Sequence, residues 1–334
     1  MRLKQNLINR GVNMDFEVAK KELQKLNKTI VLPEGDDVRI LKAGVRLAEE
    51  KIANVILLGN EDEITNMAKE NNLDIANVKI VDNLNDSNFD MYANKMFEVR
   101  KGKNTLEECK NLLKGRNYYG VMMLYNNECD ALLGGATYST ADTVRPALQI
   151  IKTKPTSKIV SSCFLMEKEG YDSLVFADCG INVNPTSEEL KDIAKDSADS
   201  ARVFGLNPKV AFLSFSSKGS AKSEEVNKVI NAVNLLKEEG ADFDFDGELQ
   251  FDAAFVESVG KQKAKDSKVA GHANVFIFPT LDAGNIGYKI AQRLGGYQAL
   301  GPILQGINKP INDLSRGCNE EDVYKMAIIT LLQK

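Results

Sequence analysis

Histidine and tryptophan are nearly missing from this sequence, which has one His and no Trp among its 334 residues. A Ser-His-Asp triad needs a histidine beside the nucleophile, and zinc sites usually need several converging His or Cys side chains. The single histidine, His272, lies in the segment GHAN (residues 271–274), which is typical of a turn that enters a strand. We therefore expect His272 at the surface, and neither kind of site.

Long apolar runs and paired cysteines are lacking as well. No apolar run is long enough to cross a bilayer, and residues 1–13 have no apolar core of a signal peptide. Met14 offers an alternative start, which would make the residues before it an extension that the fold does not need. The five cysteines are scattered, contain no C-x-x-C pair and are odd in number, which argues against a complete disulfide framework: Cys109, Cys129, Cys163, Cys179 and Cys318. These features predict a cytoplasmic protein.

A strong charge of either sign is also absent. The net charge of −4 gives no electrostatic reason to expect nucleic acid or an anionic membrane surface as a partner. No two glycines are spaced G-x-G, and the Gly-Lys pairs lack the context of a P-loop, so both nucleotide-binding fingerprints are missing. An anionic substrate must then be bound by locally placed Arg and Lys side chains.

Two polar segments leave alternatives open. Residues 214–220 (SFSSKGS) follow a predicted strand and form either a phosphate-binding loop or an ordinary polar loop before a helix. Residues 246–252 (DGELQFD) carry three carboxylates, which indicate either a divalent-metal site or a polar face at a domain or dimer contact. Period-two alternation would place Glu248, Gln250 and Asp252 on one face of a strand.

Short β runs alternate with helical patterns through most of the chain, which predicts an α/β protein with mostly parallel sheets. The length favours two domains, and Pro155 marks a change of character at which we place a boundary. Beyond it, residues 159–166 and 173–179 have the spacing of a hairpin, so an antiparallel element is expected there.

The stretch INDLSRGCNEED (residues 311–322) carries the strongest functional signal. The residues after it repeat apolar side chains at helical spacing, so we interpret the stretch as a loop that enters a helix N-terminus. Asn319 suits the N-cap, and Asp322 falls at the third helical position, the partner in a capping box. Ser315 and Arg316 supply a hydroxyl and a bidentate oxyanion clamp beside a helix end that favours anions. Ordinary capping chemistry is the alternative to a phosphate site.

Several segments resemble the phosphate acetyltransferase (phosphotransacetylase) family. Its C-terminal signature is similar to residues 312–318 (NDLSRGC), 284–289 (GNIGYK) and 301–306 (GPILQG) of this chain. Further segments extend the resemblance from about residue 28 to the C-terminus: DTVRPALQ (142–149), FADC (176–179), LSFSSKGSA (213–221) and DGELQFDAAFV (246–256). His272 and the extension before Met14 are departures from the family pattern.

The resemblance implies a two-domain α/β protein related in fold to the isocitrate and isopropylmalate dehydrogenases. One domain would hold residues 1–155 and 303–334, and the other residues 156–302, with the active site in the cleft between them. It also implies a homodimer in acetate metabolism that needs no metal and no permanently bound cofactor. Its small-molecule substrates would be CoA, acetyl-CoA, phosphate and acetyl phosphate, in the reversible reaction of acetyl-CoA with phosphate to give CoA and acetyl phosphate.

The residue inventory fits this chemistry. Asp322 would take the proton of the CoA thiol, Arg316 would hold the phosphate, and Ser315 would donate to the carbonyl or the phosphate. By resemblance, Arg100 and Arg145 are candidates for binding the anionic groups of CoA or of the acyl phosphate. Lys289 is the candidate for a supporting positive charge.

Three other functions compete with this reading. A phosphate butyryltransferase would use the same chemistry and would differ in the size of its acyl pocket. The sequence does not determine that size. A dehydrogenase on the related fold would need a nicotinamide site and usually a divalent metal. A non-catalytic binding protein is disfavoured because Ser315, Arg316 and Asp322 occur together.

Overall fold

The computed structural model describes residues 13–333, which form two compact units. The N-terminal unit holds residues 16–154 and 307–333, and the central unit holds residues 13–15 and 155–306. The second boundary lies after residue 306 rather than 302, because strand β10 (Gln298–Gln305) pairs with β5 (Ser161–Glu167) of the central unit up to Gln305. The predictions on the signal peptide and on the extension before Met14 fall mainly on residues 1–12, outside the described residues.

The N-terminal unit is built on a five-stranded, all-parallel sheet with the strand order β11-β4-β1-β2-β3. Its strands are β1 (Thr29–Leu32), β2 (Asn54–Leu58), β3 (Val78–Val81), β4 (Ala131–Gly134) and β11 (Ile311–Asp313). Its helices are α1 (Phe16–Leu26), α2 (Val38–Glu49), α3 (Glu61–Glu70), α4 (Phe89–Arg100), α5 (Leu106–Leu113), α6 (Arg116–Tyr125), α7 (Thr140–Pro146), the π-helix η1 (Ala147–Ile151) and α13 (Glu320–Leu332). The predicted alternation of strands and helices is thus confirmed.

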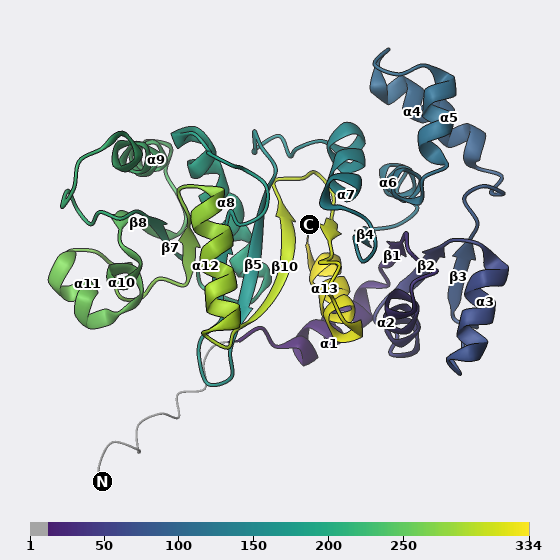
Figure 1. The fold of residues 1–334 in the computed structure, drawn as a ribbon, viewed down its shortest axis with the longest axis horizontal. Coiled ribbons are helices and arrows are strands. Elements are labelled where there is room, and N and C mark those ends of the chain that lie inside the picture. Colours follow the sequence, from purple (N-terminus) through teal and green to yellow (C-terminus); the bar gives the residue numbers. More distant parts are fainter. Residues whose placement is uncertain (1–12, 334) are drawn as a thin grey trace, which may run out of the picture. The chain divides into compact units, whose positions relative to one another are not determined.

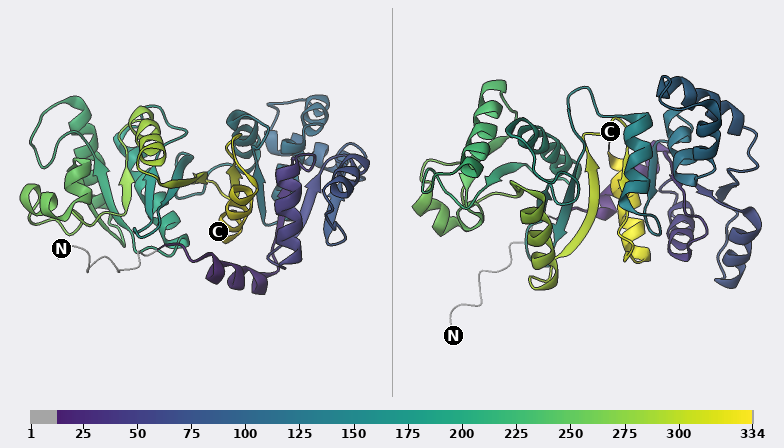
Figure 2. Two further views of the ribbon diagram at one scale, coloured as in Figure 1. Left: turned by 60° about the horizontal axis from the view of Figure 1, so that its bottom comes forward. Right: turned by 45° about the horizontal axis from the view of Figure 1, so that its top comes forward.

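The C-terminal segment belongs to this unit by direct pairing. Strand β11 runs parallel to β4, with Asn312 opposite Leu133. Helix α13 packs against α2 and α1, so the chain end lies beside helices from the first fifty residues (Figure 1 and Figure 2). Buried apolar side chains such as Val323, Ile328 and Leu331 hold it there. This return brings the residue 311–322 stretch beside the loop that starts α2.

The central unit contains a six-stranded mixed sheet with the order β10-β5-β6-β9-β7-β8. Its remaining strands are β6 (Leu174–Ala177), β7 (Lys209–Leu213), β8 (Asp244–Leu249) and β9 (Val275–Ile277), and its helices are α8 (Ser187–Val203), α9 (Glu224–Glu239), α10 (Phe251–Phe255), α11 (Glu257–Lys263) and α12 (Leu281–Arg293). Strands β5 and β6 pair antiparallel, which confirms the predicted hairpin. Phe164, Phe176 and Phe276 are among the buried side chains of its core.

One local prediction is wrong: Glu248, Gln250 and Asp252 do not share a strand face. Strand β8 ends at Leu249, and Gln250 is the N-cap of α10, so Asp252 lies in the first turn of a helix. Glu248 is buried and accepts hydrogen bonds from Ser216 Oγ at 2.9 Å and Gly219 N at 2.7 Å. These donors come from the polar 214–220 loop, so its groups bind a carboxylate of the chain itself.

None of the helices between residues 13 and 333 combines the length and the apolar character that a bilayer crossing requires.

Candidate active site

Three loops of the N-terminal unit meet at one edge of its sheet. They follow β1, β4 and β11, which are adjacent and parallel, so their carboxyl ends lie at the same edge. This is the edge at which parallel α/β sheets usually bind ligands. The loop after β11 carries Ser315 and Arg316, two of the residues that the sequence indicates.

A buried carboxylate organises the loop after β4. Glu34, which follows β1, is 1% exposed and accepts from four successive backbone N–H groups and one hydroxyl. The donors are Gly135 N (2.8 Å), Ala136 N (3.0 Å), Thr137 N (2.6 Å), Thr137 Oγ1 (2.6 Å) and Tyr138 N (3.1 Å). Five donors satisfy the charge that burial would otherwise penalise. The motifs in the sequence did not single out Glu34.

The loop after β11 ends in the predicted capping box. Asn319 Oδ1 accepts from Asp322 N at 2.9 Å, and Asp322 Oδ2 accepts from Asn319 N at 3.1 Å. The cap prediction is therefore confirmed. Ser315 Oγ accepts from Gly317 N at 3.3 Å, a contact that uses the oxygen and leaves the hydroxyl proton available to donate.

Arg39 in the first turn of α2 holds this loop, and the sequence did not single it out. Its Nη1 donates to Arg316 O at 3.0 Å and to Cys318 O at 2.9 Å, and its Nη2 donates to Ala136 O at 3.0 Å. Nε and Nη2 bind the Asp37 carboxylate at 3.0 and 2.7 Å. Burial alone would raise the pKa of Asp37, but the hydrogen bonds from Arg39 outweigh it, and the pKa is lowered. One guanidinium thus connects all three loops.

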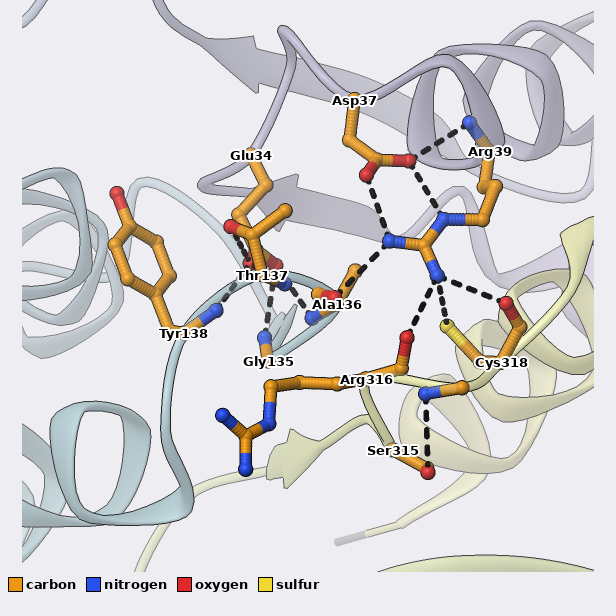
Figure 3. A network of polar contacts seen from close by, with 11 residues as sticks. Glu34, Asp37, Arg39, Gly135, Ala136, Thr137, Tyr138, Ser315, Arg316 and Cys318 are labelled. Atoms are coloured by element: carbon orange, nitrogen blue, oxygen red, sulfur yellow. Dashed lines mark hydrogen bonds and ion pairs between the residues drawn. The ribbon is translucent and has the colours of Figure 1, made fainter.

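The guanidinium of Arg316, in contrast to that of Arg39, is not bound by neighbouring groups of the described residues. Its backbone carbonyl binds Arg39, while its guanidinium extends away from Arg39 (Figure 3). Among the residues from 13 to 333, that guanidinium makes no hydrogen bond or ion pair, and the residue is exposed. Within the described residues, a bidentate oxyanion clamp is therefore unpaired at the position that follows Ser315 in the loop.

A second buried carboxyl lies directly before this loop. Asp313 at the end of β11 is 1% exposed, and its Oδ2 accepts from Thr140 Oγ1 at 2.7 Å, whereas Oδ1 has no hydrogen-bond partner in the described part of the chain. A Cβ at Gly135, which has a φ of +104°, would lie 2.2 Å from Asp313 Oδ1, so glycine permits this close approach. Burial raises the pKa of Asp313 to about 6, although Thr140, Thr143 and Arg316 oppose the rise.

The thiol of Cys318 is buried beside the loop rather than presented at it. Its Sγ lies 3.7 Å from Arg39 Nη1. Burial raises the pKa of the Cys318 thiol to about 11, even though the charge of Arg39 acts in the other direction. At neutral pH the sulfur is therefore protonated, and a protonated thiol is a poor nucleophile.

The charges of Arg100 and Arg145 both act on Tyr118. Arg100 ends α4, and its Nε donates to Asn104 Oδ1 at 2.8 Å. Its Nη1 donates to Gln149 O at 3.5 Å, and the Tyr118 hydroxyl donates to Gln149 Oε1 at 3.0 Å. Burial raises the pKa of Tyr118, and the positive charges of Arg145 and Arg100 oppose that rise. Arg145 is exposed in the last turn of α7, whose first residue, Thr140, binds Asp313. Five residues of helix separate these positions by about 7–8 Å along the axis.

Lys289 lies in the other unit. It is exposed on α12, with its Nζ 5.8 Å from the centroid of the Tyr288 ring. The N-terminal unit therefore carries five of the six residues indicated by the sequence, and the central unit carries Lys289.

A family model described as "Phosphate acetyl/butaryl transferase" matches residues 16–331. The chain belongs to this family. Among its members, the phosphate acetyltransferase of Bacillus subtilis (strain 168) is 52% identical over 318 residues, which cover 95% of this chain and 98% of that protein. The crystal structure of a phosphotransacetylase from Streptococcus pyogenes matches with a TM-score of 0.92 and 48% identity, over 95% of this chain and 97% of that one. The resemblance drawn from the motifs is confirmed.

A more distant likeness concerns the fold alone. A putative 4-hydroxythreonine-4-phosphate dehydrogenase from Salmonella typhimurium matches with a TM-score of 0.54 at 10% identity, over 92% of this chain and 99% of that one. Together with the mostly parallel sheets, this likeness confirms the predicted dehydrogenase-like α/β fold class.

Proposed function

We propose that this protein transfers an acetyl group reversibly between CoA and phosphate, in the reaction acetyl-CoA plus phosphate to CoA plus acetyl phosphate. Family membership and relatives named phosphate acetyltransferase over nearly the whole chain support this activity. The observation that carries it is the exposed guanidinium of Arg316, which makes no hydrogen bond or ion pair within residues 13–333 and follows Ser315 in the loop before a helix N-terminus. That combination binds a phosphate and stabilises an oxyanion.

The proposed mechanism is direct attack by the CoA thiolate within a ternary complex. The thiol proton passes to Asp322, the sulfur forms a bond to the acetyl carbon, and the bond from that carbon to the phosphate oxygen breaks. Arg316 binds the phosphate group throughout the reaction. The Arg316 guanidinium stays positively charged while the phosphate leaves. Ser315 donates a hydrogen bond to the carbonyl oxygen, on which negative charge develops.

An acyl-enzyme on Cys318 is disfavoured by the surroundings of its sulfur. The thiol is buried, its pKa is raised to about 11, and Arg39 Nη1 lies against it at 3.7 Å. Direct transfer from acetyl phosphate to CoA also needs no protein nucleophile. CoA acts here as a substrate, and the proposed mechanism uses no permanently bound cofactor and no metal.

Arg100 and Arg145 are proposed to bind the anionic groups of CoA, with Lys289 as a supporting positive charge. The support is that burial raises the pKa of one tyrosine, Tyr118, and the positive charges of both arginines oppose that rise, so they act on the same region. Phosphate-rich ligands such as CoA are usually bound by clustered arginines, because the guanidinium fork matches phosphate oxygens.

A homodimer is proposed on the basis of α12. Ile286, Ile290 and the C-cap residue Leu294 recur every fourth residue, so they follow one side of the helix and its end, and they are 57%, 53% and 86% exposed. A row of large apolar side chains open to water is a typical protein-contact surface.

The decisive experiment measures thioester formation by its ultraviolet absorbance, with purified protein, CoA and a series of acyl phosphates. Acetyl phosphate should give the largest kcat/KM. A larger value for butyryl phosphate would make the protein a phosphate butyryltransferase that uses the same site. No thioester with any acyl phosphate, together with reduction of a nicotinamide cofactor by a 2-hydroxy acid, would indicate the dehydrogenase alternative.

A further inference from the structure

The guanidinium of Arg39 has no donor left over. An arginine side chain carries five N–H groups, one on Nε and two on each Nη. Nε–H and one Nη2–H bind Asp37, the other Nη2–H binds Ala136 O, and the two Nη1–H groups bind Arg316 O and Cys318 O. Every donor is therefore used by the protein, and the Asp37 carboxylate balances the charge.

This arrangement argues against Arg39 as a ligand for substrate. A substrate anion could reach its N–H groups only by displacing Asp37 or one of three backbone carbonyls. Each displaced group would lose a charge-assisted hydrogen bond, which is among the stronger hydrogen bonds in proteins. Arg316 shows the opposite pattern, because its guanidinium has no such partner among the described residues.

We propose that Arg39 is a positioning residue, which fixes the backbone of residues 316–318 so that the Arg316 side chain and the Ser315 hydroxyl face the reacting groups. The inference rests on the proposed acetyl transfer. Within the described residues, the 315–318 segment is joined to other parts of the chain by hydrogen bonds from Arg39 alone. Its remaining bonds are internal, from Gly317 N to Ser315 Oγ and from Cys318 N to Ser315 O.

The flanking contacts show why this segment needs such an anchor. On one side, Leu314 N donates to Gly134 O at 2.7 Å, and on the other side the capping box starts at Asn319. Between these two fixed points, the backbone can shift unless its carbonyls are held. A misplacement of about 1 Å in a catalytic group lowers a rate about 10²-fold. The contact with Ala136 O further joins the segment to the loop that Glu34 organises.

The test compares Arg39→Ala and Arg39→Lys with Arg46→Ala as a matched control. Arg46 lies two turns later on the same helix and also connects it to α13, through an ion pair with Glu321 at 2.6 Å and a contact 3.7 Å from the centroid of the Tyr324 ring. It makes no hydrogen bond to residues 315–318 in the described structure. It therefore controls for the loss of an arginine that joins α2 to the C-terminal segment.

Arg39→Ala should lower kcat about 10²-fold and raise KM for acetyl phosphate, while KM for CoA changes little. Guanidinium chloride at low millimolar concentration should restore part of kcat in this variant, and sodium chloride at equal ionic strength should not. Arg46→Ala should keep its kcat and show no rescue. Arg39→Lys should fall between, because one ammonium cannot bind a carboxylate and three carbonyls in the same geometry.

Hydrogen exchange measures the same anchor without any assay of activity. In Arg39→Ala, backbone amides in residues 135–138 and 315–319 should exchange faster than in the unsubstituted chain, and Arg46→Ala should not show this. Arg39→Lys serves as the test if the alanine variant does not fold. Unchanged exchange in these segments, or a loss of kcat that Arg46→Ala reproduces, would overturn the proposal. If the unsubstituted chain transfers no acyl group, the proposed function fails, and the exchange result still decides whether Arg39 holds the segment.

Discussion

Arg39 Nη1 donates a hydrogen bond to the backbone oxygen of Arg316 at 3.0 Å, so one arginine holds the main chain of another. The two side chains therefore divide the work of the site. The guanidinium of Arg39 is fully bound within the protein and is proposed to set a geometry. The guanidinium of Arg316 has no hydrogen bond or ion pair within residues 13–333 and is proposed to bind an anion. The predictions below separate these tasks from those of the neighbouring residues.

Arg316→Lys tests the phosphate clamp. A planar guanidinium binds two phosphate oxygens at once, which an ammonium cannot reproduce. We expect kcat/KM for acetyl phosphate to fall on the order of 10²-fold, as when one donor to an oxyanion is removed. Thermal stability should hold, because the guanidinium of Arg316 makes no hydrogen bond or ion pair within residues 13–333. Unchanged kinetics would place the phosphate elsewhere.

Asp322→Asn tests the general base. The amide oxygen of Asn can still accept from Asn319 N, so the capping box and the melting temperature should change little. Loss of the base should lower kcat about 10²–10⁴-fold with modest changes in both KM values. Glu321→Gln in the same helical turn is the matched control and should keep its activity. A variant that melts much earlier yet turns over normally would show that Asp322 is only a cap.

Cys318→Ala tests the ternary complex. Because the thiol is buried and its pKa is raised to about 11, we expect most of the activity to remain. Initial-rate plots with both substrates varied should intersect. Parallel lines, or an acetyl group trapped on Cys318 of the unsubstituted chain, would instead establish a covalent intermediate.

Asp313→Asn tests a pH dependence of stability. The pKa of Asp313 is about 6 in the folded protein, against about 3.9 for an unperturbed aspartate. A raised pKa in the folded state means that stability is greatest below the unfolded pKa and is lost as pH rises through the folded one. The difference between the folded and the unfolded pKa of Asp313 corresponds to a loss of about 3 kcal/mol in the free energy of unfolding.

The measurement is urea unfolding of both proteins between pH 4 and pH 8. The variant has no carboxyl to ionise at position 313, so its stability relative to the unsubstituted chain should increase across this range by about 3 kcal/mol. The other titrating groups contribute equally to both proteins, so their contributions cancel when the two stabilities are subtracted. A difference that is independent of pH would show that Asp313 does not titrate in this way.

Ile290→Glu tests the proposed dimer. A charge in the middle of the apolar row of α12 should shift sedimentation from dimer toward monomer, because a buried unpaired carboxylate is costly at a contact. Gln292→Glu, two residues away and on a different side of the helix, should leave the assembly unchanged. A monomer in both the unsubstituted chain and the variant would remove the proposal.

Local patterns were enough for much of the fold and part of the site. Alternating β and helical patterns predicted the parallel sheet, and the residue types at 319 and 322 predicted a capping box, because both depend on nearby residues. Strand β10 did not stand out, since Gly301 and Pro302 interrupt its apolar pattern, and β11 is only three residues long.

The part of the site that could not be predicted depends on contacts between distant segments of the chain. Arg39 and Arg316 are 277 positions apart, and Glu34 and Thr137 are 103 apart. A single sequence carries no signal for such pairs. An aspartate before a helix, such as Asp37, indicates an N-cap at most. Only the folded sheet shows that Arg39 reaches three backbone carbonyls.

The Glu34 carboxylate has a consequence for how quickly products can depart. Backbone N–H groups grouped at the end of a strand would bind a phosphate tightly, and a tightly held phosphate would leave slowly after each turnover. Here those N–H groups already bind a carboxylate that is covalently part of the chain, so no solute anion competes for them. At the proposed site, a departing phosphate would detach from the exposed Arg316 side chain and not from these N–H groups, which suits the reversible transfer proposed above.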